Sequence, residues 1–169
     1  MKIRNGFVSN SSSSSFIIGF PRMPESAHEL HSWMFPEGPI SITTYDWMPG
    51  VTSEEAAKIV FNDIQGQNPL SYAGIAAMLH QGEVSTNLVT FPPWPDTWNL
   101  PKGEREAVHK KYEEDTQAAA DKLAEIFTHT HAGKVFFDVS YSDNDGPVMI
   151  TMEHGDVFRN IPFARISNH

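Results

Sequence analysis

The sequence predicts an α+β fold, with one mainly antiparallel sheet of about four strands and three or four helices packed on it. Two observations lead to this fold class. Of the 169 residues, 40% are hydrophobic, which is enough to build the core of one domain. Segments with strand and helix patterns follow one another in mixed order, without an internal repeat. We expect the helices to cover one face of the sheet.

Two strands are expected in the first third of the chain. Phe16–Phe20 is a short apolar run that ends at Pro21, and its length suits a buried strand. Ile40–Trp47 alternates along its length and is rich in β-branched and aromatic side chains. We therefore predict a strand in each of these segments.

A β-hairpin is predicted near the C-terminus. Val135–Tyr141 and Val148–Met152 have strand patterns, and the Asp-Asn-Asp-Gly-Pro segment between them has the composition of a turn. We expect this hairpin to pair centrally in the sheet. Alternation along its strands predicts that they bury Phe137, Val139 and Ile150.

Four segments have helical patterns. The clearest helix N-terminus is at Thr52, because Glu55 follows three residues later in the manner of a capping box. The segment from Glu83 to about Leu100 is expected to be a loop. The predicted helices span Ser26–Met34, Thr52–Ile64, Leu70–His80 and Pro101–Thr128, of which the last is the longest.

A serine-rich segment, residues 1–15, precedes a single domain over residues 16–169. Three roles are open for the serine run: a solvated leader, an ordered turn that holds an anion, and a recognition or modification segment. We expect the segment to dock partly on the domain, because Ile3, Phe7 and Val8 are too apolar for a fully solvated leader. Its candidate binding residues are Ser11, Ser12 and Ser13.

The N-terminal pattern is the most specific feature of the sequence. Lys-Ile-Arg-Asn-Gly-Phe-Val-Ser-Asn at residues 2–10, followed by five serines and Phe16, resembles the opening of small uncharacterised proteins from bacteriophages and bacteria. A weaker resemblance to the same proteins covers Tyr141–His169, including Met-Glu-His-Gly-Asp at residues 152–156. The resemblance implies a phage or prophage origin. It implies no activity and assigns no catalytic residue.

The composition disfavours several classes of protein. There are 21 acidic and 12 basic residues, a net charge of −9, which disfavours generic binding to nucleic acid. No apolar run approaches the length of a membrane span, and there is no signal peptide pattern. The absence of Cys excludes disulfides and Cys-ligated metals. We expect a cytoplasmic protein without a cofactor, located in the host cell cytoplasm if a phage encodes it.

A metal-assisted hydrolase is the catalytic alternative. Histidines and carboxylates gather toward the C-terminus, and in an extended segment His129 and His131 would point the same way. At a helix end they would diverge and favour the helix dipole. No zinc-motif spacing is present, so we expect no bound metal. If one binds, its ligands would come from His129, His131, His154, Asp156 and His169.

A proline-rich loop at residues 91–98, Phe-Pro-Pro-Trp-Pro-Asp-Thr-Trp, carries the other candidate binding residues, Phe91, Trp94 and Trp98. Prolines stiffen an extended segment and reduce the entropy that it loses on binding a partner. The alternative is that both indoles cover the domain's own core, because large aromatic side chains are highly buried on average. We favour this second interpretation for the two indoles.

The leading hypothesis is a phage-type accessory protein that acts by binding another protein, without catalysis. No nucleophile elbow, P-loop or dinucleotide fingerprint occurs in the sequence. The alternatives are the metal-assisted hydrolase and a structural component of the virion. The sequence does not identify the protein partner and leaves the oligomeric state open.

Overall fold

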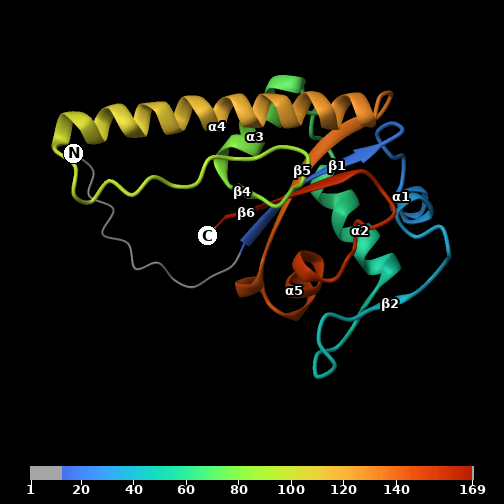
Figure 1. The fold of residues 1–169 in the computed structure, drawn as a ribbon. Coiled ribbons are helices and arrows are strands. Elements are labelled where there is room, and N and C mark those ends of the chain that lie inside the picture. Colours follow the sequence, from blue (N-terminus) through green and yellow to red (C-terminus); the bar gives the residue numbers. More distant parts are fainter. Residues whose placement is uncertain (1–12, 169) are drawn as a thin grey trace.

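The structure, a computed structural model, describes residues 13–168. The main strands are β1 (Ser13–Phe20), β4 (Glu83–Val84), β5 (Val135–Ser142) and β6 (Phe163–Ser167). Within the described residues, these four form an antiparallel sheet in the order β4-β6-β1-β5 (Figure 1). The N-terminal strand therefore lies inside the sheet, between β5 and β6. The predicted α+β class with a mainly antiparallel sheet is confirmed.

Five α-helices accompany the sheet in the described part of the chain. They are α1 (Ala27–Met34), α2 (Ser53–Ile64), α3 (Tyr72–Gln81), α4 (Lys102–Thr130) and α5 (Pro147–His154). The first four match the predicted helices, and Thr52 caps α2 by accepting a hydrogen bond from the Glu55 N–H. None of the five has the length together with the apolar content that a membrane span requires.

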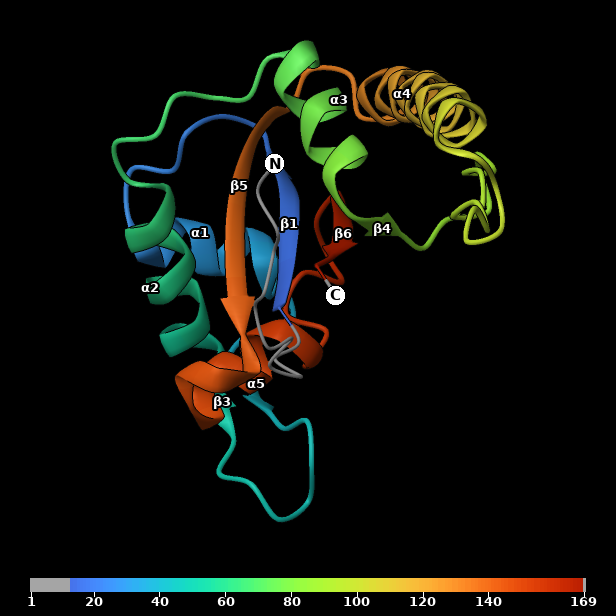
Figure 2. The ribbon, with the colours of Figure 1, turned by 90° about the vertical axis from the view of Figure 1, so that its left-hand side faces the viewer.

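Helices pack on both faces of the sheet, so the expectation that they cover one face is wrong. Figure 2 shows α1 and α2 on one side of the sheet and α3 and α4 on the other. The reason lies in β1, whose Phe16, Ile18 and Phe20 enter one apolar cluster while Ile17 enters another. A strand that is apolar at successive positions is buried on both faces. We call the face under α1, α2 and α5 the closed face, and the face under α3 and α4 the open face.

The side chains of β5 divide between the two faces in the same way. Phe137 and Val139 are buried on the closed face, as predicted, while Phe136 is buried on the open face. Phe136 lies opposite Gly19 of β1, where an added Cβ atom would come within 2.8 Å of the phenyl ring. Glycine at position 19 therefore leaves room for this ring.

The predicted hairpin after β5 is wrong. Val148–Met152 belongs to α5, and a 3-10 turn at Asp143–Asp145 precedes it. Pro147 stands in the first turn of α5, where its fixed φ and missing N–H are tolerated, directly after Gly146 with a φ of 95°. A short apolar run does not by itself distinguish a strand from a helix. As a result β5 is an edge strand and not a central one, and Ile150 is only half-buried.

Only the beginning of the predicted strand Ile40–Trp47 is extended. β2 (Ser41–Ile42) pairs with β3 (Val51–Thr52) in a small second sheet. The chain then turns, and Trp47 is 79% exposed. Backbone polar groups need partners, so alternation alone does not extend a strand past the end of its pairing.

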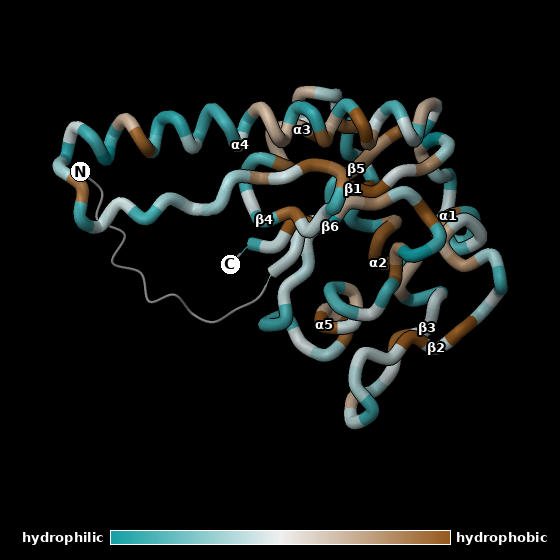
Figure 3. The backbone as a smooth tube through the Cα atoms, viewed as in Figure 1, coloured by the Kyte–Doolittle hydropathy of each residue, from teal (hydrophilic) through white to brown (hydrophobic). Residues whose placement is uncertain are grey.

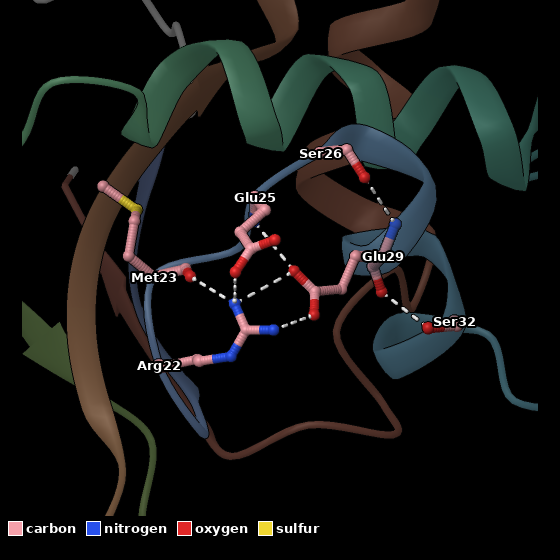
Figure 4. Close-up of polar contacts among 6 residues, drawn as sticks. All are labelled: Arg22, Met23, Glu25, Ser26, Glu29 and Ser32. Carbon is pink, nitrogen blue, oxygen red and sulfur yellow. Dashed lines mark hydrogen bonds and ion pairs between the residues drawn. The ribbon is translucent and has the colours of Figure 1, made fainter.

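Local polar contacts fix the beginning of α1 (Figure 4). Ser26 caps the helix by accepting a hydrogen bond from the Glu29 N–H, and the Glu29 carboxylate accepts one from the Glu25 N–H. Arg22 forms ion pairs with Glu25 and Glu29, and its guanidinium lies 5.7 Å from the centre of the Trp33 ring. Because Trp33 packs on the closed-face cluster, these contacts hold the connection from β1 to α1 against that face.

The serine run enters the sheet at its end. β1 begins at Ser13, so Ser13 and the next two serines belong to the strand, which was predicted to start at Phe16. Ser11 and Ser12 lie outside the described residues, as do the apolar residues Ile3, Phe7 and Val8. The partial docking expected for that segment stays a prediction.

Candidate functional site

Helix α4 extends beyond the sheet that it covers (Figure 1). Its 29 residues make a helix about 44 Å long, whereas the longest strands, of 8 residues, reach about 26 Å. Its buried residues begin only at Thr116. The N-terminal half, Lys102–Asp115, therefore lies outside the core, and Figure 3 shows it as mostly hydrophilic.

The proline-rich loop runs beside this overhanging half of α4. Trp94 is 70% exposed and Trp98 is 89% exposed, so the expectation that both indoles cover the core is wrong. Phe91 is half-buried and packs on the open-face cluster. Because the buried residues of α4 begin only at Thr116, the part of the loop that lies beside the overhanging half of α4 has no core into which the indoles could fold.

Trp94 is held in place by one side of α4. The centroid of its ring lies 5.0 Å from that of Tyr112, in an edge-to-face arrangement, and 5.5 Å from that of His109. Thr97 is a second point at which the loop is attached to α4, because its side chain is buried and its hydroxyl lies 3.2 Å from His109 Nε2. The Trp94 indole is therefore exposed but restricted in position.

A groove of about 950 Å³ lies beside Trp94. Its walls come from the end of α3, from β4 and the end of β6, from the proline-rich loop, and from α4. In the described part of the chain, β4 is the outer strand of the sheet and no strand pairs with its far edge. The groove is thus bordered by an open sheet edge and by aromatic side chains.

The groove is acidic. Glu83 and Glu113 line it, and none of the described residues that line it is Lys or Arg. The Oε2 atom of Glu113 lies 3.3 Å from Nε2 of His80. Thr116 also lines the groove; it is 8% exposed, and its hydroxyl has no hydrogen-bond partner among the described residues.

Four of these residues occupy one side of α4. His109, Tyr112, Glu113 and Thr116 are spaced i, i+3, i+4 and i+7, which places them on one helix face. Sequence reasoning named none of these four residues as a candidate for the site. The signal that could have found them is the mixture of aromatic, acidic and hydroxyl groups at helical spacing, just before the buried alanines Ala119 and Ala120.

The last serines of the run contribute to a buried polar network, in a strand and not in an anion-binding turn. Ser14 is fully buried, and its hydroxyl donates to Glu153 Oε1 at 3.0 Å and accepts from Arg165 Nε at 3.0 Å. A terminal nitrogen of Arg165 lies 3.6 Å from Glu153 Oε1 and 3.4 Å from His154 Nδ1. The second nitrogen of the His154 ring lies 3.6 Å from Glu153 Oε2.

This network joins the N-terminal and the C-terminal sequence patterns described above. Ser14 comes from the N-terminal pattern, whereas Glu153, His154 and Arg165 come from the C-terminal one. Because Ser14 is enclosed, a substrate has no access to its hydroxyl. Buried charges that are hydrogen-bonded to one another stabilise one arrangement of the elements that carry them. We therefore assign the network a structural role, which is to hold β1, α5 and β6 together.

The candidate metal ligands do not converge. His129 and His131 lie at the end of α4, whereas His154 and Asp156 lie at and just after the end of α5. Among residues 13–168, no group of three His, Cys, Asp or Glu side chains is placed to hold a metal ion. His169 lies outside the described residues.

Comparisons of the chain with protein-family models, with curated protein sequences and with solved structures found no match. The resemblance to phage proteins stays a prediction from the sequence. We take the groove as the candidate functional site, because exposed aromatic and acidic groups from several elements meet there.

Proposed function

We propose that this protein is a phage-type accessory protein that binds an extended segment of another protein in the groove and performs no catalysis. The observation that carries the proposal is the Trp94 indole, which is 70% exposed and yet held against Tyr112. Aromatic side chains of this kind dominate the binding energy of many protein interfaces. Binding there costs little ordering entropy, because the prolines and the contact of Thr97 with His109 already restrict the loop.

The borders of the groove favour an extended occupant. One border is the far edge of β4, whose backbone N–H and C=O groups can pair with an added strand. The other border is the proline-rich loop with Trp94. A segment between them would pair its backbone with Glu83–Val84 and direct alternate side chains toward the indole.

The charges of the groove favour a basic occupant. Glu83 and Glu113 line it without a Lys or Arg among the described lining residues, and the whole chain carries a net charge of −9. Such a surface attracts segments that carry Lys or Arg, and it repels acidic segments and the phosphates of nucleic acid. The partner segment is therefore expected to combine apolar residues with basic ones.

The proposed origin and location of the protein rest on its sequence. The resemblance of residues 2–16 supports a phage origin, with the host cell cytoplasm as the proposed location. The hydrolase is not favoured, because its candidate ligands within the described residues lie at the ends of two different helices. Mass spectrometry of purified particles separates the accessory protein, which is absent from them, from a structural component of the virion.

A displayed library of short random peptides tests the proposed binding. We expect the full chain to select peptides that combine apolar and basic residues, and we expect Trp94→Ala to lose this selection. Trp47→Ala is the matched control, because Trp47 is 79% exposed on the loop after β2, which Figure 1 shows far from α4. Selection of no peptide, or an equal loss in both variants, would contradict the proposal.

A further inference from the structure

We infer that the groove contains a pocket for an arginine side chain of the partner segment, formed by Trp94, Tyr112, Glu113 and Thr116. The inference rests on the proposed function and adds the chemical group that the groove recognises. Two properties of these residues support it: an aromatic surface and an acidic group beside it.

Trp94 and Tyr112 provide the aromatic surface. Their rings are inclined by 71° with centroids 5.0 Å apart, so the two side chains form a corner. The indole is 70% exposed, which leaves most of its surface open to a ligand. A cation placed over the face of an aromatic ring is attracted by the ring's quadrupole, and Trp is the most effective ring for this interaction.

Glu113 places a carboxylate next to Tyr112 on the groove side of α4. The two lysines that precede it in α4 do not neutralise this carboxylate, because Lys110 pairs with Glu114 and Lys111 pairs with Asp115. The carboxylate of Glu113 lies beside His80, whose Nε2 is 3.3 Å from its Oε2. His80 and Glu113 are both in the lining of the groove, so an incoming guanidinium would share the carboxylate with His80 or replace it.

Thr116 forms part of the wall of the groove beside Glu113. It follows Glu113 by three residues and Tyr112 by four, so all three lie on the same side of the helix. The threonine is 8% exposed, and its hydroxyl has no partner among the described residues. Because the hydroxyl oxygen is enclosed, Thr116 shapes the wall of the pocket, and the polar contact for a ligand comes from Glu113.

Arginine matches this set of groups better than lysine does. Its guanidinium is planar, remains charged, and carries five N–H donors, so it can stack on Trp94 while it donates to Glu113. A lysine ammonium is a compact point charge that lacks the planar stacking surface. Citrulline is the best negative probe, because it keeps the planar shape of arginine but has no charge.

Titration of the full-length protein, labelled with nitrogen-15, tests the pocket without any knowledge of the partner. The ligands are N-acetyl-arginine amide and N-acetyl-citrulline amide, and the readout is the indole N–H signal of Trp94, identified by its loss in Trp94→Phe. We expect a saturable shift with the arginine compound and an affinity at least about tenfold weaker for the citrulline compound. The Trp47 signal should not move with either.

Glu113→Gln should reduce the preference for arginine over citrulline to roughly threefold or less, while Glu125→Gln, an exposed carboxylate change on the same helix, should retain it. Equal affinities for the two ligands, or a preference that Glu113→Gln leaves intact, would overturn the inference. So would a displacement of the Trp94 signal in Lys2→Gln/Arg4→Gln without ligand, because the chain's own basic residues would then be the occupant. Failure of the peptide selection together with a normal arginine titration would reject the proposed function alone.

Discussion

The closed and open faces of the sheet share the same strands but are completed differently (Figure 2). On the closed face, α1, α2 and α5 cover a large cluster in which Phe137 is fully buried. On the open face, α3 and the C-terminal half of α4 cover a smaller cluster, and the rest of α4 continues past it. Trp94 and Trp98 lie beside that continuation and are exposed. The closed face therefore mainly supplies stability, whereas the proposed binding groove lies at the margin of the open face.

Alanine substitutions of Phe137 and Phe136 test this division, because the two rings are neighbours on β5 and face opposite ways. Loss of a buried Phe side chain lowers the free energy of unfolding by about 3–5 kcal/mol. We expect a loss near the upper end of this range for Phe137→Ala, and a loss near the lower end for Phe136→Ala, whose ring lies in the smaller cluster. Trp98→Ala should change the free energy of unfolding by less than about 0.5 kcal/mol, since the indole is 89% exposed. Urea unfolding measures all three, and a larger loss for Phe136→Ala would reverse the comparison.

Ser14→Ala and Ser15→Ala make the same comparison for polar contacts. Ser14 is buried toward the closed face, and its loss removes a donor from Glu153, whose side chain is fully buried. We expect the free energy of unfolding to fall by about 1–3 kcal/mol, because a buried charge loses a hydrogen bond. The Ser15 hydroxyl contacts the neutral side chains of Ser140 and Asn168 at exposed positions, so Ser15→Ala should cost about 0.5 kcal/mol or less. Equal losses in urea unfolding would contradict the role assigned to the network.

The pH dependence of stability at the end of α4 is the smallest expected effect. Burial, with a smaller contribution from the charge of Lys134, lowers the pKa of His131 below its ordinary value of 6.5. The unfolded chain therefore takes up this proton more readily, and stability falls as the pH drops through 6.5 toward the folded pKa. Because the ring is partly exposed, solvent screens the effect and we expect only a small loss of stability.

Urea unfolding of His131→Gln, near pH 7.5 and near pH 5, measures this contribution. The substitution should remove that part of the pH dependence, because glutamine does not titrate in this range. His129→Gln is the control, since His129 is exposed on the same helix end. An unchanged pH dependence in His131→Gln would show that the partly buried ring does not cause it.

The sequence by itself determined the elements whose signals are local. The capping pair Thr52 and Glu55 and the helical spacing of apolar residues located the first four helices, because a helix is formed by hydrogen bonds between residues four apart. The apolar run Phe16–Phe20 located the strand β1, because its buried side chains are adjacent in the sequence. Alternation in Val135–Tyr141 likewise predicted which residues of β5 are buried on the closed face.

Tertiary structure alone decided the features that depend on distant residues. Whether Val148–Met152 forms a strand or a helix depends on what packs against it, and its composition suits both. Ser14 and Glu153 are 139 positions apart, and no local sequence pattern predicts their hydrogen bond. The groove exists because α4 is longer than the sheet beneath it, which leaves Trp94 and Trp98 outside the core. The sequence does not reveal whether a core lies beside a given Trp residue, so only the assembled fold shows that these two indoles lie at the surface.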